Sequence, residues 1–437
     1  MNPHRLTWSY AYHFRFNYFI AMVTLLGLLF AWKKNVPMPR CFTVYLLGAF
    51  LGWTFVTSLY AFNYPWADWK QLLKIYMMII ATFMVLDARK PMLILLTIIT
   101  LSIGFFGVKG GIFTITTGGQ FQVLGPARSF FSDNNMFALA ELMVVPMFLF
   151  LRTQAKHWVL RQTLLAMSFL AALSIVGSYS RGGLVGLVVI TIYFWLRTPG
   201  KIKITLVIGI ALPIILSLMP PKWHERMIAM TDKIQVPHQI VELLNPPSTF
   251  DARNDPFPDG LLVQERKTIK LGDSSVQGRV QAWQFAWLVA KDRPFVGGGF
   301  RTFHYNIFRR YMPNVQRRAA HSIYFQVLGE HGFVGLGLWL LLHLSAFKVR
   351  HWTMKKTKRD PDLFWAHELA RYIGISLMGY YAAGTFLGLA YFDLPFHYIS
   401  ILVILQVIVQ KELTAKYVAP KKVGRFPYVP AEAKPAS

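Results

Sequence analysis

Long apolar stretches separated by short polar connections dominate this sequence. A helix needs about 20 mostly apolar residues to cross the hydrocarbon core of a bilayer. The pattern predicts an all-α polytopic membrane protein with about 11–12 transmembrane helices. The eleven stretches that approach the required length lie at residues 14–32, 41–62, 71–87, 91–115, 134–151, 158–178, 182–197, 202–219, 322–347, 369–392 and 395–410.

The distribution of basic residues predicts how these spans face the two sides of the membrane. One set consists of alternate connections, beginning with the one after the first span, and the C-terminal tail; it carries 23 Lys and Arg residues. The other set consists of the opposite short connections and the N-terminal tail, and it carries 6. Lys and Arg collect in cytoplasmic loops. The richer set is therefore predicted to be cytoplasmic, and residues 220–320 are predicted to lie outside. The 15 basic residues of that long segment do not oppose this, because long loops translocate largely regardless of charge.

The predicted orientation has a consequence for the N-terminus. An odd number of spans with a cytoplasmic C-terminus places Met1 outside, and residues 1–15 contain no apolar core of a signal peptide. Either this short tail crosses the membrane by itself, or a first span precedes it. We expect the second.

Composition supports a membrane protein and excludes an ordinary soluble enzyme. Hydrophobic residues make up 54% and charged residues 15% of the 437 residues, and the mean hydropathy is +0.39. A soluble domain averages about 25% charged residues. The formal charge of +26 fits cytoplasmic loops lying against anionic lipid. A single cysteine, Cys41, excludes a disulfide framework and a multi-cysteine metal site.

Four regions follow from these patterns. Residues 1–219 form an N-terminal transmembrane bundle, 220–320 a large periplasmic loop subdomain, 321–411 the C-terminal transmembrane helices and 412–437 a cytoplasmic tail. The subdomain is expected to be mainly helical. We predict a short amphipathic helix around Trp223 and Met227, a second helix over residues 280–290, and a turn at GlyGlyGlyPhe, residues 297–300.

Two exterior arginines are candidates for holding a phosphate. Arg181 lies in SerTyrSerArgGlyGly, where a new helix is predicted to begin, and Arg279 follows Gly278 just before the helix predicted at 280–290. Unpaired N–H groups and the dipole at a helix N-terminus suit an anion, and an arginine beside them adds a charged fork. The alternatives are a lipid-headgroup anchor for Arg181 and an ordinary surface arginine for Arg279.

His321 is a candidate general base at the point where the long exterior segment enters the next span. A neutral imidazole there can accept a proton from an attacking hydroxyl. Tyr324 is predicted one helical turn deeper on the same face. Glu330 and His331 lie further along the span, where ionisable groups are costly and are functional candidates by default. The alternatives are a water-satisfied interfacial histidine at 321 and helix–helix hydrogen bonds at 330 and 331.

A polar exterior loop, GlyProAlaArgSerPhePheSerAspAsnAsn at 125–135, adds further candidates. Asp133, Asn134 and Asn135 could hydrogen-bond a sugar or a diphosphate, with help from Arg128. The alternative is that they cap the following helix. There is no Walker loop and no HisGluXaaXaaHis, and no AspXaaAsp motif occurs in the segments predicted to be exterior, which disfavours a nucleotide-driven transporter and a metal-held nucleotide sugar. Few acidic residues occur in the spans, which weakens an ion-coupled transporter.

In these residues the chain resembles the bacterial O-antigen ligase and polymerase superfamily of membrane glycosyltransferases. The resemblance covers nearly the whole chain through the span pattern, SerTyrSerArgGlyGly, the GlnGlyArg segment at 277–279, GlyGlyGlyPhe and HisSerIleTyr at 321–324. MetAsnProHis at 1–4 and GlyValLysGlyGly at 107–111 resemble the branch known as O-glycosylation ligases, associated with exosortase systems. In that branch another span usually precedes MetAsnProHis.

The resemblance implies a GT-C-like fold and a periplasmic reaction at the Gram-negative inner membrane. A glycan on undecaprenyl diphosphate is transferred to a hydroxyl, typically on lipid A–core oligosaccharide. By this resemblance His321 is the base, and Arg181 and Arg279 hold the diphosphate, with Arg128, Asn134 and Tyr324 as further substrate-binding candidates. Cationic donors around the leaving diphosphate make a metal or other cofactor unnecessary, and direct attack inverts the anomeric centre.

Three rivals to lipid A–core ligation stay open. An O-glycosylation ligase would use serine or threonine of exported proteins, and a polymerase would use a second lipid-linked glycan. A transporter of the same lipid-linked glycan would need the arginines but not His321. The sugars, the acceptor and the oligomeric state do not follow from these motifs.

Overall fold

The protein is built from helices, as the computed structural model shows. The structure describes residues 16–30, 37–197 except 128 and 130, parts of 201–228, and 274–418 except 314. Helices make up 77% of the described residues, and no strand occurs among them. The helices are α1 (Phe16–Phe30), α2 (Phe42–Leu59), α3 (Trp66–Val85), α4 (Arg89–Thr116), α5 (Asn134–Gln154), α6 (Trp158–Gly177), α7 (Arg181–Arg197), α9 (Pro221–Ile228), α11 (Ser274–Asp292), α12 (Tyr305–Tyr311), α13 (Ile323–Thr357), α14 (Phe364–Gly384) and α15 (Asp393–Val418).

The long apolar helices make this a polytopic membrane protein. Six described helices, α2, α4, α5, α6, α13 and α15, are long and apolar enough to cross a membrane, and α1 and α7 contain shorter apolar stretches. Each span predicted from the sequence has a helix at its place, except that residues 202–219 lie largely outside the described residues, as do residues 1–15, 229–273 and 419–437. The hydrophobic runs therefore located these helices correctly.

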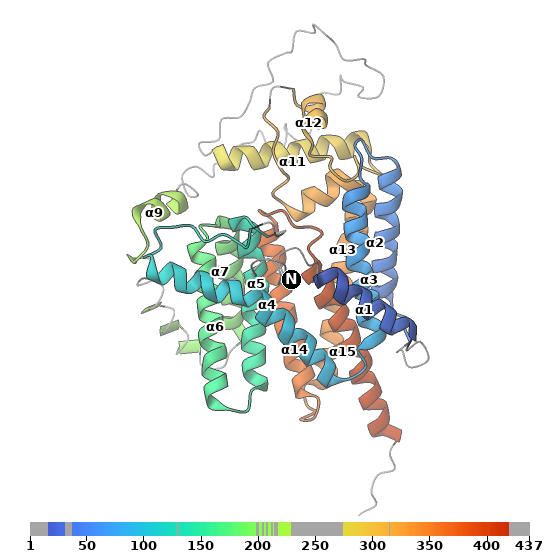
Figure 1. Ribbon diagram of the computed structural model, residues 1–437, viewed down its shortest axis with the longest axis vertical. Helices are drawn as coiled ribbons and strands as arrows, with labels where there is room; N and C mark the ends of the chain where they lie inside the picture. The colour runs from blue at the N-terminus through green and yellow to red at the C-terminus, as the bar shows by residue number, and fades with distance from the viewer. Residues whose placement is uncertain are drawn as a thin grey trace, which may run out of the picture.

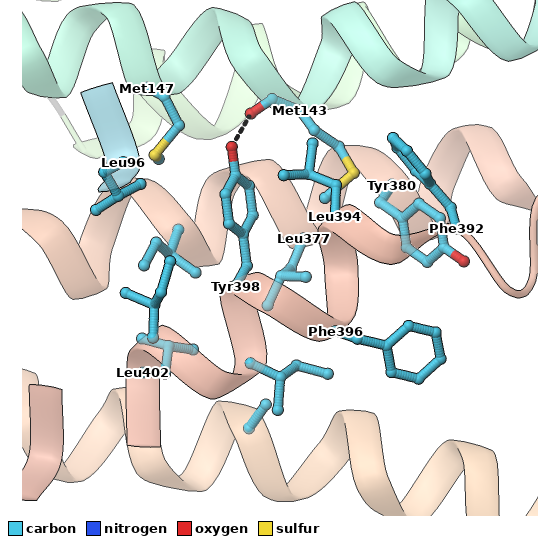
Figure 2. Packing of buried hydrophobic residues seen from close by; sticks show 14 of the residues in the cluster. Leu96, Met143, Met147, Leu377, Tyr380, Phe392, Leu394, Phe396, Tyr398 and Leu402 are labelled. Carbon is cyan, nitrogen blue, oxygen red and sulfur yellow. Dashed lines mark hydrogen bonds between the residues drawn. The ribbon is translucent and has the colours of Figure 1, made fainter. Parts of the chain in front are cut away.

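The centre of the bundle is formed by α5, α14 and α15. These helices are apolar on nearly all sides, as expected for helices buried on every face. Met143 and Met147 of α5, Leu377 of α14 and Tyr398 of α15 pack together there (Figure 2). The hydroxyl of Tyr398 donates to the backbone carbonyl of Met143 at 3.4 Å, so even this polar atom is satisfied inside the core.

Small residues allow α4 to lie very close to its neighbours. A Cβ atom on Gly111 would stand 2.2 Å from the carbonyl oxygen of Leu170 in α6, and one on Gly104 would stand 2.2 Å from the ring of Phe148 in α5. Helices in membranes pack through such small residues because backbones can then approach closely. Thus α4 is joined to both α5 and α6.

A separate helical layer covers one end of the bundle. In Figure 1, α11 lies across that end and α12 lies beyond it. Phe285 of α11 stacks on Phe308 of α12 with ring centroids 4.4 Å apart, and α11 also packs against α13. This layer belongs to the later part of the exterior segment predicted from the sequence, whereas α9 lies at its start.

Two of the predicted spans are not continuous helices. The span predicted at 369–392 ends as a helix at Gly384, and residues 385–392 form an irregular connection to α15. The helix α13 is broken at Gly332, whose φ is 67° and ψ −169°. Hydropathy does not reveal either interruption, because irregular backbone at membrane depth is tolerated when protein groups satisfy it. The hydroxyl of Tyr380 donates to the carbonyl of Leu389 at 2.9 Å in the connection.

Candidate functional site

The turn between α6 and α7 places Arg181 at a helix start, as predicted. Ser180 caps α7, because its hydroxyl accepts from the N–H of Gly183 at 3.1 Å and its carbonyl accepts from Leu184 at 2.9 Å. Tyr179, just before it, has a φ of 58° and is held by a bond from its hydroxyl to the carbonyl of Gly119 at 2.6 Å. The side chain of Arg181 is half-buried at this position.

The start of α5 lies against the same turn. The Asp133 carboxylate accepts from the N–H groups of Asn135 and Met136 at 2.7 and 3.0 Å, which confirms that it caps α5. The Asn134 side chain donates to the carbonyl of Ser178 at 2.9 Å, and the hydroxyl of Ser180 donates to Asn135 at 2.9 Å. Both asparagines thus hold the turn that leads to Arg181.

Arg279 is not placed where the sequence suggested. The helix α11 begins at Ser274, so Arg279 lies in its second turn and not ahead of its N-terminus. The sequence favours a later start, after Gly278, because glycine is a poor helix former. In the structure Gly278 serves close packing instead, since a Cβ there would stand 3.1 Å from Nε of Arg318. Arg279 therefore gains no support from a helix N-terminus. Its positive charge can still attract a phosphate.

A tryptophan of α11 fixes the segment that leads to His321. The indole N–H of Trp283 donates to the carbonyl of Ala320 at 3.0 Å. Its ring stacks on Phe325 of α13, with centroids 5.1 Å apart and planes 7° apart. The backbone on either side of His321 is consequently anchored to the helix that carries Arg279.

His321 lies at a strained backbone position among charged groups. It has a φ of 43°, in the left-handed region that is rare for residues other than glycine. Its side chain is half-buried. Burial, and then the nearby positive charges of Arg279 and Arg318, lower the pKa of the imidazole below its ordinary value, against the opposing effect of Asp133. The imidazole is therefore neutral near pH 7 and able to accept a proton.

The structure thus brings four predicted candidates to one corner of the bundle. Arg279, Asp133 and His321 lie close enough to interact electrostatically. Arg181 reaches the same corner through the contacts between the α6–α7 turn and the start of α5. Arg128 lies outside the described residues.

Tyr324 does not share a helical face with His321, because α13 begins only at Ile323. Its hydroxyl donates to the carbonyl of Tyr381 in α14 at 3.2 Å, which directs it into the bundle. The deeper residues are also engaged within the protein. The hydroxyl of Tyr391 donates to Glu330 at 2.6 Å, and Thr57 of α2 forms a 2.7 Å hydrogen bond with Nδ1 of His331.

Arg318 is the site residue that the sequence analysis missed. It is one of two adjacent arginines three residues before His321, and it is half-buried beside Gly278. A basic pair so close to a candidate base was a usable signal. Among residues with assigned positions, no three His, Cys, Asp or Glu side chains gather into a metal-ligand set. The corner thus presents cations and an imidazole, which suit an anionic substrate.

Comparison with known families divides the chain in two. Residues 166–340 match a family described as O-antigen ligase, and residues 1–156 match a family of unknown function. Arg181, Arg279, Arg318 and His321 all fall within the first match, and Asp133 falls within the second. No curated protein matches the chain.

Proposed function

Because residues 166–340 carry the O-antigen ligase domain, this chain belongs to the O-antigen ligase and polymerase superfamily, and we propose that it transfers a glycan from undecaprenyl diphosphate to a hydroxyl of lipid A–core oligosaccharide. Members of this family are glycosyltransferase-like enzymes. The reaction takes place at the periplasmic side of the inner membrane, where α11 and α12 cover the bundle.

One observation carries the proposal: a half-buried histidine lies among arginines at one end of a membrane bundle. His321 is half-buried and has a lowered pKa, and Arg279 and Arg318 act on it electrostatically. A base that is neutral near the working pH and cations that attract a diphosphate are the two groups that this transfer needs. A purely structural membrane protein would leave this histidine and these arginines without a role.

The residues support a direct displacement. His321 accepts the proton of the acceptor hydroxyl as the oxygen attacks the anomeric carbon. The bond from that carbon to the diphosphate oxygen breaks, and the lipid diphosphate leaves with the bonding electron pair. Arg181 and Arg279 stabilise the negative charge that develops on it. One displacement inverts the anomeric centre, and no step requires a metal ion.

The test is transfer by the purified protein in detergent. The protein is mixed with undecaprenyl-diphosphate glycan and lipid A–core in the presence of EDTA, and the product is followed as a laddered gel shift. We expect transfer by the wild type and a loss of about 10²–10⁴-fold in His321→Ala. His304→Ala is the matched control, because His304 is an exposed histidine at the same end of the bundle.

The outcomes test the base, the metal independence and the choice of acceptor in turn. Near-normal transfer by a folded His321→Ala protein would show that the histidine is not the base. Loss of transfer in EDTA that magnesium restores would contradict the metal-independent mechanism. If lipid A–core accepts no glycan, exported-protein acceptors and a second lipid-linked glycan are tried, and transfer to one of these would identify an O-glycosylation ligase or a polymerase instead. Movement of the donor across vesicles without transfer would identify a transporter.

A further inference from the structure

The carboxyl group of Glu330 is shared by three segments of the chain. Glu330 is 6% exposed, and the hydroxyl of Tyr391 donates to it at 2.6 Å from the connection between α14 and α15. The side chain of Gln326, one turn earlier in α13, and the backbone N–H of Arg301 donate toward the same carboxyl group. A buried carboxyl group is stable only when hydrogen-bond partners surround it, so the three segments are held to one another at this point.

Backbone hydrogen bonds at the break in α13 strengthen this junction. The glycine turn after α11 donates from Gly298 to the carbonyl of Gly329 at 2.9 Å, and from Gly299 to the carbonyl of Glu330 at 2.8 Å. The turn therefore supplies the partners that the interrupted helix lacks. The connection between α14 and α15 contributes as well, because the N–H of Ala390 donates to the side-chain oxygen of Gln326 at 3.4 Å.

Unusual backbone geometry is concentrated around Glu330. Arg301 has a φ of 63°, Leu389 a φ of 140° and Gly332 a φ of 67°. Non-glycine residues in this region cost free energy and persist only where the surroundings hold them, often at functional sites. Arg301 is further held by an ion pair with Asp68 of α3.

Each segment that meets at Glu330 leads to one of the proposed reactive residues. The first half of α13 begins two residues after His321. The glycine turn follows α11, which carries Arg279. The connection 385–392 contains Leu387, which packs against Gly182 beside Arg181, since a Cβ on Gly182 would stand 2.8 Å from Leu387. The relative placement of the three reactive residues thus depends on this junction.

We propose that Glu330 is a positioning residue that sets the spacing of His321, Arg279 and Arg181 for glycan transfer. This inference rests on the proposed function. Glu330 acts through the backbone segments that it joins and touches none of the reacting atoms. Its effect is on the rate of the chemical step, because a misplacement of about 1 Å can cost about 10²-fold in rate.

The experiment compares variants of the full-length protein in detergent. Tyr391→Phe removes one hydroxyl and keeps the ring, whereas Glu330→Gln replaces one oxygen of the carboxyl group with an amide NH₂, which can only donate. We expect kcat to fall about tenfold in Tyr391→Phe and by up to about 10²-fold in Glu330→Gln, with KM for the donor changed less than about twofold. The double variant is expected to match Glu330→Gln, because both substitutions break one shared contact.

The matched control is Glu368→Gln. Glu368 is a buried carboxylate of α14 that pairs with Arg371 at 3.0 Å near the opposite end of that helix. We expect this control to keep kcat. Hydrogen exchange supplies a readout that does not depend on activity, and we expect Tyr391→Phe to accelerate exchange in residues 385–392 and 297–301 together.

The outcomes separate this inference from the proposed function. If the wild type transfers glycan and both variants keep kcat, Glu330 has a packing role only, and the transfer function stands. If the wild type transfers no glycan to any acceptor, the proposed function fails, and the positioning role fails with it as a statement about transfer. If kcat falls but exchange in the two segments is unchanged, the junction is not the cause, and the inference is overturned.

Discussion

At the residue scale, the electrostatic surroundings of His321 determine when it can act as a base. Its pKa is lowered first by burial and then by the positive charges of Arg279 and Arg318. A histidine base is active only when neutral, so under the proposed function we expect transfer to fall as the pH drops through the pKa of the imidazole. Because that pKa is depressed, the fall is expected at a pH below the ordinary histidine value of 6.5.

Arg318 offers a test of this effect. Replacing Arg318 with Ala removes a positive charge that lowers the pKa of His321. We expect the acid limb of the plot of kcat/KM against pH to move to higher pH in Arg318→Ala. The control is Arg309→Ala, an exposed arginine of α12. If the acid limb stays in place or moves to lower pH, the fall in kcat/KM at low pH is not caused by protonation of His321.

The proposed diphosphate ligands are tested by a charge-conserving substitution. We expect Arg181→Lys and Arg279→Lys each to lose most of the transfer activity, by about tenfold or more, because lysine keeps the charge but lacks the planar fork that binds two phosphate oxygens. The measurement is kcat/KM for the lipid-linked donor. Full activity with lysine would mean that charge alone suffices and that no bidentate contact is made.

At the element scale, the glycine turn after α11 and the break in α13 depend on one another. Gly297 has a φ of 61°, and a Cβ there would stand 2.6 Å from the backbone nitrogen of Gly332. The backbone cannot move far at either place, because the N–H of Gly297 donates to the carbonyl of Arg293 at 2.9 Å and the N–H of Phe333 donates to the carbonyl of Pro294 at 2.8 Å. Substitution at this position must therefore separate the turn from the helix.

We expect Gly297→Ala to destabilise the protein by about 2 kcal/mol or more, through the positive φ and the backbone clash together. Gly337→Ala is the matched control, because Gly337 lies in helix α13 and a Cβ there would meet nothing within 4 Å. Alanine favours a helix over glycine by about 1 kcal/mol, so the control should be neutral or stabilising. Thermal unfolding in detergent measures both, and equal Tm values would contradict the prediction.

Sequence reasoning worked well for whole helices and poorly for their interruptions. Hydrophobic runs gave the positions of α2, α5 and α6 closely, because burial in lipid or protein depends on composition over about 20 residues. The irregular connection at 385–392 and the break at Gly332 were not predicted. Both are stabilised by partners far away in the chain, which no local pattern reveals.

At the scale of the whole molecule, the charge distribution predicts the orientation. Lys156 lies in the exposed connection between α5 and α6, at the end predicted to be cytoplasmic, and His304 is exposed beside α12 at the other end. In the orientation that we propose, α11 and α12 lie in the periplasm.

Cysteine labelling tests this orientation in intact cells. In a Cys41→Ser background, which removes the single native cysteine, we expect His304→Cys to react with a membrane-impermeant maleimide that has crossed the outer membrane. Lys156→Cys should react only after the inner membrane is opened. The reverse pattern would place the proposed site on the cytoplasmic side.

The amino-acid sequence by itself determined the membrane class, the course of the helices, the cap at Asp133 and the start of α7 at Arg181. These features depend on local runs of side chains and on residues within one turn of each other. Only the tertiary structure decided that Arg279 and Asp133 lie near His321, that Tyr324 points into the bundle, and that Glu330 meets Tyr391. Those contacts join residues far apart in sequence, so they exist only once the helices have packed.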